Sequence, residues 1–207
     1  MVISAPEKHQ LERDLDTALN NLKSSVNASR IGTAGRITID QAVETAMSAH
    51  EGQQRDEGDP YIIHPVRVAT DYLQRWPQRP VHYAATAVLH DVLEDSEITE
   101  DDLQETFGRT VASGVDALTK NKQLPEDKMR CRYRERLNGL SKPLLQIKIV
   151  DRIDNLRSCF LNPDEKKVVR YVQYSKKHYL PLARKAGDTL YDDMKAILSA
   201  LTERFST

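Results

Sequence analysis

Along most of the chain, apolar residues return every three or four positions, the spacing of a helix with one buried face. Alternation of apolar and polar residues, which would indicate a strand, is almost absent. The first helical stretch has an apolar stripe made of Leu11, Leu15, Leu19, Leu22 and Val26. This helix either packs on its own domain or makes a contact in an oligomer.

A linker is predicted after this helix, from Ser24 to Gly35. Residues 1–36 are therefore expected to form an N-terminal helical extension, and residues 37–207 the main domain. Thr38 and Gln41 match a capping box at the start of the next helix. That helix is expected to end near His50 to Gly52, with its buried stripe made by Ala42, Val43, Ala46 and Ala49.

Helices fill the rest of the chain. Pro65 suits the first turn of a helix, which places His64 at the N-terminal edge. A central helix is expected to begin near Pro80 and to include the stretch Ala85–Asp95. The remaining pattern predicts helices over residues 100–107, 111–119, 127–140, 143–157, roughly 163–176 and 178–204. Thr99 is the expected N-cap of the first of these, and Gly108 is expected to end it. We therefore predict an all-α fold.

Composition narrows the possible functions. The 207 residues are 39% hydrophobic and 29% charged, as in a soluble globular protein. A net charge of -1 gives no bulk attraction to nucleic acid or to a membrane surface. No apolar run is long enough to span a bilayer, and no secretory segment is apparent. With only Cys131 and Cys159, the protein is expected to carry two free thiols in the reducing cytoplasm.

A few polar residues lie within otherwise apolar helices. His90 and Asp91 end an apolar run and are followed at once by Glu94 and Asp95, on one flank of the predicted helix. Burying an imidazole and three carboxylates there is costly unless a cation compensates them. The sequence therefore predicts that this helix forms one wall of a metal site.

Two further residues complete a plausible ligand set. His64 lies at a helix edge, and Asp151 follows the apolar stretch Leu144–Val150. A set of two histidines and two carboxylates, His64, His90, Asp91 and Asp151, suits manganese, iron, zinc or cobalt. A divalent ion lowers the pKa of water, about 15.7 in bulk, and neutralises phosphoryl oxygens. Such a centre is therefore suited to activating water for hydrolysis.

Three segments carry a resemblance to a known family: Gly52–Pro65, Leu89–Asp95 and Asp151–Arg157. In this order they resemble the HD-domain hydrolases of the RelA/SpoT group, in particular small alarmone hydrolases that consist of the hydrolase domain alone. The resemblance covers roughly residues 37–200. It implies a helical bundle with a metal site in a central cleft, usually holding manganese. The implied reaction removes the 3′-pyrophosphate of (p)ppGpp and yields GDP or GTP with pyrophosphate.

The resemblance also implies roles for individual residues. The four metal ligands would be His64, His90, Asp91 and Asp151, and the acidic pair Glu94 and Asp95 would orient or deprotonate the attacking water. Arg55 would lie against the purine face, Asn155 would contact the ribose, and Ser158 and Leu161 would line the nucleobase pocket. His50 would support the site through its neighbours. With 207 residues the chain is expected to have no synthetase half.

Two positions depart from the family pattern. Asp56 stands where the family commonly has a lysine. The choice of substrate therefore stays open among guanine alarmones, adenine alarmones such as (p)ppApp, and the 2′-phosphate of NADPH. Asp154 replaces a more usual aromatic residue or histidine and is expected to pair with Arg152 or Arg157. A different class of function is a partner protein that neutralises an alarmone-synthesising toxin by direct contact.

The arginines of residues 127–140 have two interpretations. They form either a cationic rim that attracts a substrate with several phosphates or a solvated helix face balanced by nearby acids. Nucleic-acid binding is disfavoured because no aromatic residues interleave with the basic ones to stack on bases. The arginines are Arg130, Arg132, Arg134 and Arg136. Expected partners are thus a nucleotide substrate, possible further copies of the chain, and an alarmone synthetase as a functional counterpart.

Overall fold

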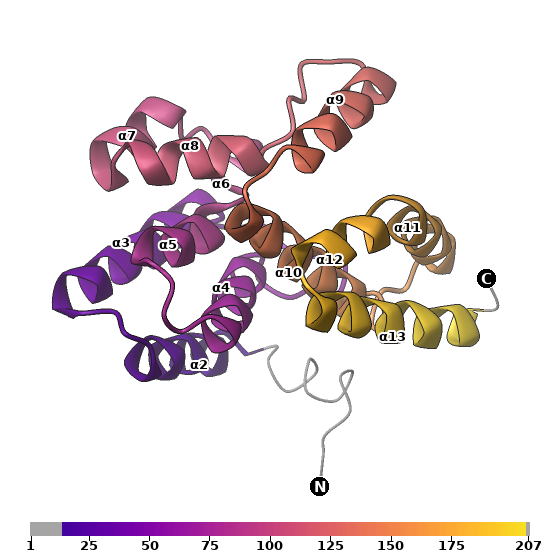
Figure 1. Cartoon of the computed structure of the whole chain (residues 1–207), viewed down its shortest axis with the longest axis horizontal. Helices are drawn as coiled ribbons and strands as arrows, with labels where there is room; N and C mark the ends of the chain where they lie inside the picture. Colours follow the sequence, from indigo (N-terminus) through magenta and orange to yellow (C-terminus); the bar gives the residue numbers. More distant parts are fainter. Residues whose placement is uncertain (1–13, 206–207) are drawn as a thin grey trace, which may run out of the picture.

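The computed structural model describes residues 14–205, which form helices α2 to α13 (Figure 1). The helices are α2 (Leu15–Ala28), α3 (Thr33–Ala49), α4 (Ile63–Arg75), α5 (Val81–Leu89), α6 (Val92–Asp95), α7 (Glu100–Phe107), α8 (Arg109–Leu118), α9 (Glu126–Asn138), α10 (Lys142–Ser158), α11 (Glu165–His178), α12 (Leu180–Ala186) and α13 (Asp188–Phe205). Within the described residues the only β-type pairing is an isolated bridge between Gln54 and Pro60. The all-α prediction is confirmed.

Helix α10 lies at the centre of the molecule. Its apolar residues Ile147, Ile149, Val150, Ile153 and Leu156 are fully buried, so the helix is covered on all sides. Helices α4, α5 and α8 pack on it from the N-terminal part, and α12 and α13 from the C-terminal part (Figure 1). Polar side chains of α10 therefore point into the interior and need partners there.

The first described helix, α2, packs against α4, with Ala18, Leu22 and Val26 in the common core. Leu11 of the predicted stripe lies outside the described residues. The predicted linker from Ser24 to Gly35 is wrong, because α2 continues to Ala28 and α3 already begins at Thr33. Ser24 and Ser25 keep their hydroxyls bonded to carbonyls one turn back, which lets them remain helical.

The predicted capping box at Thr38 is also wrong. Thr38 lies inside α3, where its hydroxyl donates to the Ala34 carbonyl. The end of α3 is as predicted, since Ala49 is its last residue and Gly52 has a φ of 73°. The division of the chain at residue 36 stays a prediction, although α3 continues across that position.

The predicted central helix starts after Pro80, as expected, but it is broken at His90 and Asp91. Asp91 has φ -108° and ψ -6°, in a sparsely populated region where active-site residues are often found. The predicted helix over 178–204 is likewise divided, because Gly187 has a φ of 152° that few side chains tolerate. Both breaks turn the chain where the sequence pattern alone is still helical.

Other predicted helix ends agree with the structure. Thr99 caps α7, and its capping box with Asp102 is complete on both sides. Gly108, with a φ of 82°, ends that helix. Pro143 lies in the first turn of α10. In the part of the chain that the structure describes, no helix has the length and apolar character needed to cross a bilayer.

Candidate metal centre and active site

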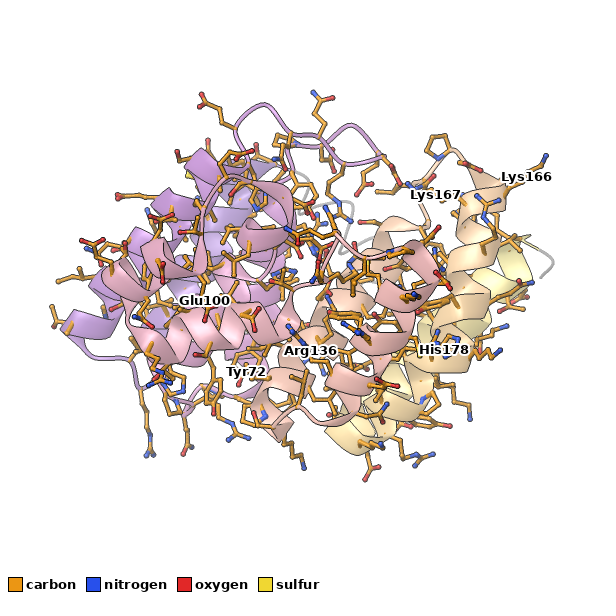
Figure 2. All side chains as sticks on the ribbon, turned by 90° about the horizontal axis from the view of Figure 1, so that it is seen from above. Tyr72, Glu100, Arg136, Lys166, Lys167 and His178 are labelled. Atoms are coloured by element: carbon orange, nitrogen blue, oxygen red, sulfur yellow. The ribbon has the colours of Figure 1, made fainter. Side chains whose placement is uncertain are left out.

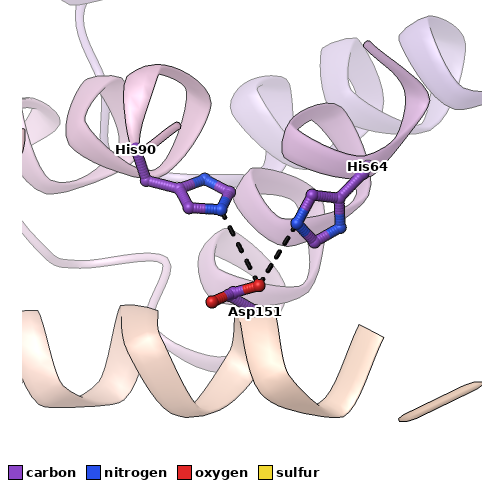
Figure 3. Close-up of side chains that lie close together, drawn as sticks. All are labelled: His64, His90 and Asp151. Carbon is purple, nitrogen blue, oxygen red and sulfur yellow. Dashed lines mark ion pairs between the residues drawn. The ribbon is translucent and has the colours of Figure 1, made fainter. Parts of the chain in front are cut away.

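The four predicted ligands meet where α4, α5 and α10 come together. His64 is in the first turn of α4, His90 and Asp91 occupy the break after α5, and Asp151 is in the middle of α10. Oδ1 of Asp151 lies 3.2 Å from Nε2 of His64 and 3.8 Å from Nε2 of His90 (Figure 3). Oδ2 of Asp91 lies 3.2 Å from Nε2 of His90 and 3.7 Å from Nε2 of His64. Ligand atoms from α4, from α10 and from the break after α5 thus face a common point.

Both histidines are held so that Nε2 faces this point. Nδ1 of His90 bonds the Ala87 carbonyl at 2.9 Å, and Nδ1 of His64 bonds Oδ2 of Asp154 at 2.7 Å. A neutral imidazole with its proton on Nδ1 has its lone pair on Nε2, ready to bind a metal. Nε2 of His90 is buried and has no hydrogen-bond partner among the described residues. Ligand atoms of His64, His90 and Asp151 all lie within 4.8 Å of one another, so this His/Asp cluster fits a divalent ion.

The electrostatics of the cluster favour a cation. Burial by itself raises the pKa of Asp91, but the neighbouring His90 outweighs burial and holds that pKa well below its usual range. The pKa of Asp151 is also lowered, because Lys148, His64 and His90 overcome its burial. In the metal-free protein burial lowers the pKa of His90, yet Asp91 and Asp151 raise it to about 10, so at neutral pH the imidazole holds a proton that a bound divalent ion would replace. Both carboxylates are therefore ionised and attract positive charge to the point between them.

A buried lysine was missed by the sequence analysis. Nζ of Lys148 lies 2.7 Å from Oδ2 of Asp151 and 5.6 Å from the centre of the Tyr133 ring. Burial lowers the pKa of Lys148, but Asp151 more than compensates and raises it well above the usual value. The signal was present in the sequence, since Lys148 interrupts the same apolar stretch that precedes Asp151. Lys148 thus forms an ion pair with Oδ2 of Asp151, while Oδ1 of the same carboxylate faces the histidines.

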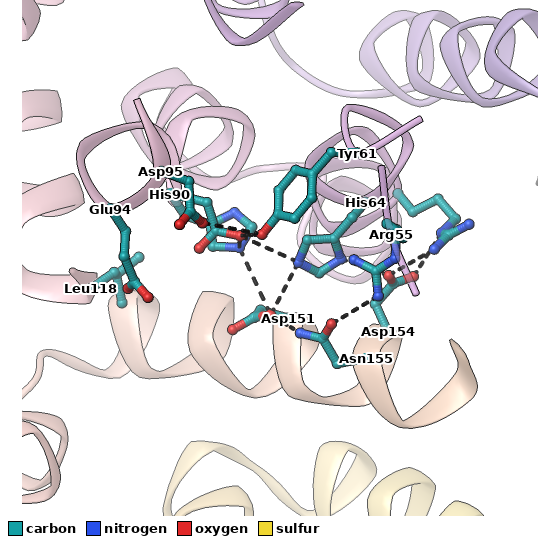
Figure 4. Close-up of polar contacts among 12 residues, drawn as sticks. Arg55, Tyr61, His64, His90, Glu94, Asp95, Leu118, Asp151, Asp154 and Asn155 are labelled. Carbon is teal, nitrogen blue, oxygen red and sulfur yellow. Dashed lines mark hydrogen bonds and ion pairs between the residues drawn. The ribbon is translucent and has the colours of Figure 1, made fainter. Parts of the chain in front are cut away.

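The acidic pair follows the break and does not continue a straight helix. Backbone N–H groups of Glu94 and Asp95 donate to the Asp91 carbonyl. The Tyr61 hydroxyl donates to Oδ2 of Asp91 at 2.7 Å and lies 3.5 Å from Oδ2 of Asp95, which links Asp95 to the ligand cluster (Figure 4). Glu94 turns instead toward Lys120, whose Nζ is 2.9 Å from its Oε1.

The cluster opens into a cavity of about 520 Å³, which we call the main cavity. Asp91, Asp95 and Asp151 line it beside the cluster. Its walls are rich in tyrosines and in cationic side chains, which come from α10, α11, α9 and the loop after α8. The cations are Lys120, Lys122, Arg130, Lys148, Arg152, Lys167 and Arg170. This cavity therefore suits a ligand with several negative charges.

A second cavity of about 210 Å³, which we call the side cavity, adjoins the first and shares Tyr61, Asn155, Lys167 and Tyr171 with it. Arg55 lies in its wall, with Nε bonded to Glu57 at 2.9 Å and one terminal nitrogen bonded to Oδ1 of Asn155 at 2.9 Å and to Oγ of Ser158 at 3.1 Å (Figure 4). Three predicted substrate residues thus form one hydrogen-bonded group.

The other two predicted positions of this region behave differently. Leu161 follows the end of α10, and it does not line either cavity. The carboxylate of Asp56 bonds Lys167 of α11 and Asn162 of the loop before it. Lys167 holds the pKa of Asp56 below its usual value. Lys167 therefore offsets the negative charge that Asp56 brings to this wall.

Asp154 does not have the expected partners. It pairs with Arg67, 2.9 Å from Nε to Oδ1, and with His64. Arg152 instead packs between the rings of Tyr171 and Tyr179 at 4.3 and 3.6 Å, and a nitrogen of Arg157 lies 3.3 Å from Asp71. The prediction that Asp154 pairs with Arg152 or Arg157 is wrong, because Arg152 is directed to Tyr171 of α11 and Arg157 reaches Asp71, farther along α4 than Arg67.

The arginines of α9 divide between the two interpretations. Arg130 lines the main cavity and forms an ion pair with Glu126. Arg136 points back to α8, where it bonds the Asp116 carbonyl at 2.6 Å (Figure 2). Alternate positions on a helix are about 200° apart, so the four arginines cannot share one face. Only some of these four arginines can therefore contact a substrate in the main cavity.

His50 is placed behind the site. Its Nδ1 lies 2.9 Å from Oε1 of Gln53, and its ring packs on Tyr61 with 4.7 Å between centres. Nε2 of Gln53 in turn donates to the Asp95 carbonyl at 2.7 Å. His50 therefore supports the loop and the tyrosine that contact Asp91 and Asp95.

Comparisons with known proteins agree with this picture. The chain is 36% identical over 157 residues to the guanosine-3′,5′-bis(diphosphate) 3′-pyrophosphohydrolase of Vibrio cholerae, covering 71% of this chain and 21% of that protein. It is 38% identical over 152 residues to the protein of that name from Haemophilus influenzae, covering 69% and 21%. The bifunctional (p)ppGpp synthase/hydrolase SpoT of Escherichia coli is 34% identical over 154 residues, covering 71% and 21%. The chain spans about a fifth of the length of these curated relatives.

Two solved structures have a similar fold. A metazoan ortholog of SpoT, described as hydrolyzing ppGpp, aligns with a TM-score of 0.72 and 24% identity over 79% of this chain and 94% of its own. A protein from Listeria monocytogenes aligns with a TM-score of 0.55 and 26% identity over 72% and 98%. The HD domain family matches residues 42–188, a range that contains all four predicted ligands. The chain therefore belongs to the HD domain family.

Proposed function

We propose that the protein hydrolyses the 3′-pyrophosphate of guanosine tetra- and pentaphosphate, (p)ppGpp, and uses Mn²⁺ to do so. The observation that carries this proposal is the convergence of His64, His90, Asp91 and Asp151 beside a cavity lined by cations. The names of the curated relatives support the same substrate. In the reaction, water attacks the phosphorus next to the ribose, the bond to the 3′ oxygen breaks, and GDP or GTP and pyrophosphate are released.

The two histidines and two carboxylates would hold the ion, which supplies Lewis-acid activation of water and neutralises phosphoryl charge when bound. The hydrogen bond from the Tyr61 hydroxyl to Oδ2 of Asp91 holds this carboxylate next to Glu94 and Asp95. Asp95, which is linked to Asp91 through Tyr61, orients the attacking water and accepts its proton. Glu94, held by Lys120 in the same wall, supports this arrangement and contributes negative charge next to it.

Substrate binding divides between the two cavities. The side cavity takes the purine, with Arg55 against its face, a contact worth about 0.5–2 kcal/mol. Asn155, shared by both cavities, contacts the ribose, and Ser158 lines the base side, whereas Leu161 lies outside both cavities. The cations of the main cavity hold the phosphates at both ends of the nucleotide. A cytoplasmic alarmone synthetase, whether separate or joined to this activity, would supply the substrate.

The test is a nucleotide panel. Purified protein with Mn²⁺ is mixed with ppGpp, ppApp and NADPH, singly and in competition, and release of pyrophosphate or phosphate is measured. We expect pyrophosphate from ppGpp, with the Asp95→Asn protein reduced by at least about 100-fold. A preference for ppApp or NADPH would mean that the protein acts on adenine nucleotides. The residues around Asp56 would then be the cause to test for that selectivity.

The non-catalytic alternative has its own outcome. If the Asp95→Asn protein still protects cells from an alarmone-synthesising toxin, and wild-type protein releases no pyrophosphate, the function is neutralisation by contact. Protection that disappears with Asp95→Asn supports hydrolysis. Mn²⁺ should be compared with Fe²⁺, Zn²⁺ and Co²⁺, and the ion that gives the highest rate identifies the preferred cofactor.

A further inference from the structure

A buried ion pair lies directly behind one of the two histidines. Asp154 receives two hydrogen bonds from Arg67, 2.9 Å from Nε to Oδ1 and 3.1 Å from a terminal nitrogen to Oδ2. The same Oδ2 lies 2.7 Å from Nδ1 of His64 (Figure 4). His64, Arg67 and Asp154 are 1%, 5% and 3% exposed. The three side chains thus form a chain of contacts away from solvent.

The positions of these residues on their helices explain the geometry. Arg67 is three residues after His64 on α4, and Asp154 is three residues after Asp151 on α10. Residues three apart lie on one face of a helix, so each helix presents one cluster residue and one supporting residue to the other. Since α4 and α10 pack together, the pair also joins these two helices at the level of the cluster.

The other histidine is held in a weaker way. Nδ1 of His90 bonds the neutral carbonyl of Ala87, which lies on the same helix. For His64 the acceptor is a carboxylate from a different helix, fixed by an arginine fork. Hydrogen bonds to charged acceptors are roughly twice as strong as neutral ones, and an Arg–carboxylate fork adds a fixed orientation. The ring of His64 is therefore the one whose direction depends on a distant side chain.

We propose that Asp154, held by Arg67, is a positioning residue for the metal centre. It accepts the Nδ1–H of His64 and so directs the Nε2 lone pair of His64 toward Asp151 and His90. Arg67 balances the charge of Asp154 and fixes its orientation. This inference rests on the metal-binding part of the proposed function. Partners of this kind behind metal-binding histidines typically change metal affinity or activity by about 10–100-fold when removed.

The test uses pairwise replacement, because either single change would leave a buried charge without a partner. In Arg67→Met/Asp154→Leu both charges are removed, and apolar side chains of similar volume fill the space. In Arg67→Met/Asp154→Asn the charges are also removed, but an acceptor oxygen for Nδ1–H is kept. The matched control is Arg75→Met/Asp193→Asn, which removes an ion pair between α4 and α13 at the other end of α4.

Mn²⁺ affinity is measured by calorimetry, the ligand geometry by the visible absorption of bound Co²⁺, and folding by circular dichroism. The Leu variant should bind Mn²⁺ about 10–100-fold more weakly and give an altered Co²⁺ spectrum. The Asn variant should remain within about threefold of wild type with a wild-type spectrum, as should the control. If the Leu variant does not fold, Arg67→Met/Asp154→Ala takes its place. It removes the same acceptor, and the same loss of Mn²⁺ affinity and the same change in the Co²⁺ spectrum are expected.

Unchanged Mn²⁺ affinity in the folded Leu or Ala variant would overturn the inference, as would an Asn variant that binds no better than they do. If the ion pair were purely structural, its removal would lower the melting temperature but leave the Mn²⁺ affinity and the Co²⁺ spectrum as in wild type. The proposed function fails in a different way. If wild-type protein binds no Mn²⁺, or binds it equally well after His90→Ala, the metal centre itself is wrong.

Discussion

The two ends of the main cavity differ in how their side chains are held. At the inner end, which we call the floor, the cluster residues and Lys148 come from helices and contact one another; the side chain of Lys148 is 4% exposed. At the outer end, which we call the rim, Lys120, Lys122 and Arg130 come from the loop after α8 and from α9, and the side chain of Lys122 is 55% exposed. The floor is fixed by packing, whereas the rim consists of long, partly exposed side chains, of which Lys120 pairs with Glu94 and Lys122 with Asp95.

This difference indicates a division of labour. Charges in the floor act at short range in a medium of low polarity, so that each one is costly to leave unpaired. Charges at the rim are screened by water and salt, and each contributes little to stability. Changes to the floor should therefore abolish chemistry or destabilise the fold, and changes to the rim should mainly alter how the substrate arrives.

The largest effect is expected from removing a floor ligand. His90→Ala or Asp91→Ala should lower Mn²⁺-dependent pyrophosphate release from ppGpp by at least about 1,000-fold, because the donor set for the ion is broken. The assay follows pyrophosphate at saturating substrate. His82→Ala, on the same helix α5 and outside the cavities, is the matched control and should retain activity. A His90→Ala protein with wild-type rates would contradict the assignment of the floor.

A second floor residue tests the stability of the buried charges. Lys148→Met leaves Asp151 without its cation and should lower the free energy of unfolding by about 3–5 kcal/mol in metal-free protein. Saturating Mn²⁺ should recover part of that loss, because the ion replaces the missing positive charge. Urea unfolding with chelator and with Mn²⁺ measures both quantities. Equal stability of variant and wild type in chelator would mean that the floor tolerates unpaired charge.

The two cysteines differ in burial in the same way as the floor and the rim. Cys159, at the buried end of α10, has its pKa raised by burial to about 11, whereas Cys131 on α9 is exposed. A raised pKa means less thiolate at pH 8, so Cys159 should be alkylated about 100-fold more slowly than a thiol with a pKa of 9.0. Its rate should still rise with pH up to about 11. Mass spectrometry after timed iodoacetamide treatment resolves the two sites, and equal rates would contradict the buried placement.

The smallest effect is expected at the rim. Arg130→Ala should raise KM for ppGpp about three- to tenfold at low salt and leave kcat nearly unchanged, because the arginine attracts the substrate and does not act in the reaction. The free energy of unfolding should change by less than about 0.5 kcal/mol. Steady-state kinetics at two salt concentrations give the comparison. A large fall in kcat would mean that Arg130 belongs functionally to the floor.

Four residues of the floor stand out in the sequence for a physical reason. His64, His90, Asp91 and Asp151 interrupt or end apolar helices, and burial makes such residues costly unless they serve a purpose. Helix ends with local signals, such as Thr99 and Gly108, were also predictable. Most of the all-α fold follows from the same helical periodicity.

What the sequence could not reveal depends on contacts between distant segments. The pairing of Asp154 with Arg67 needs the relative rotation of α4 and α10, and no local spacing contains it. The break at His90 occurs in a stretch whose pattern is helical, because contacts to the cluster outweigh local preference. Which arginine of α9 reaches the cavity depends on how α9 sits against α8 and α11.

The most direct test of the central claim is a Mn²⁺ titration of metal-stripped wild-type protein, with pyrophosphate release from ppGpp as the readout. If the floor binds the ion that the reaction needs, release should start at background and saturate at one Mn²⁺ per chain, and excess chelator should reverse it. Release that is the same before and after Mn²⁺ is added, and that chelation does not reduce, would contradict the account.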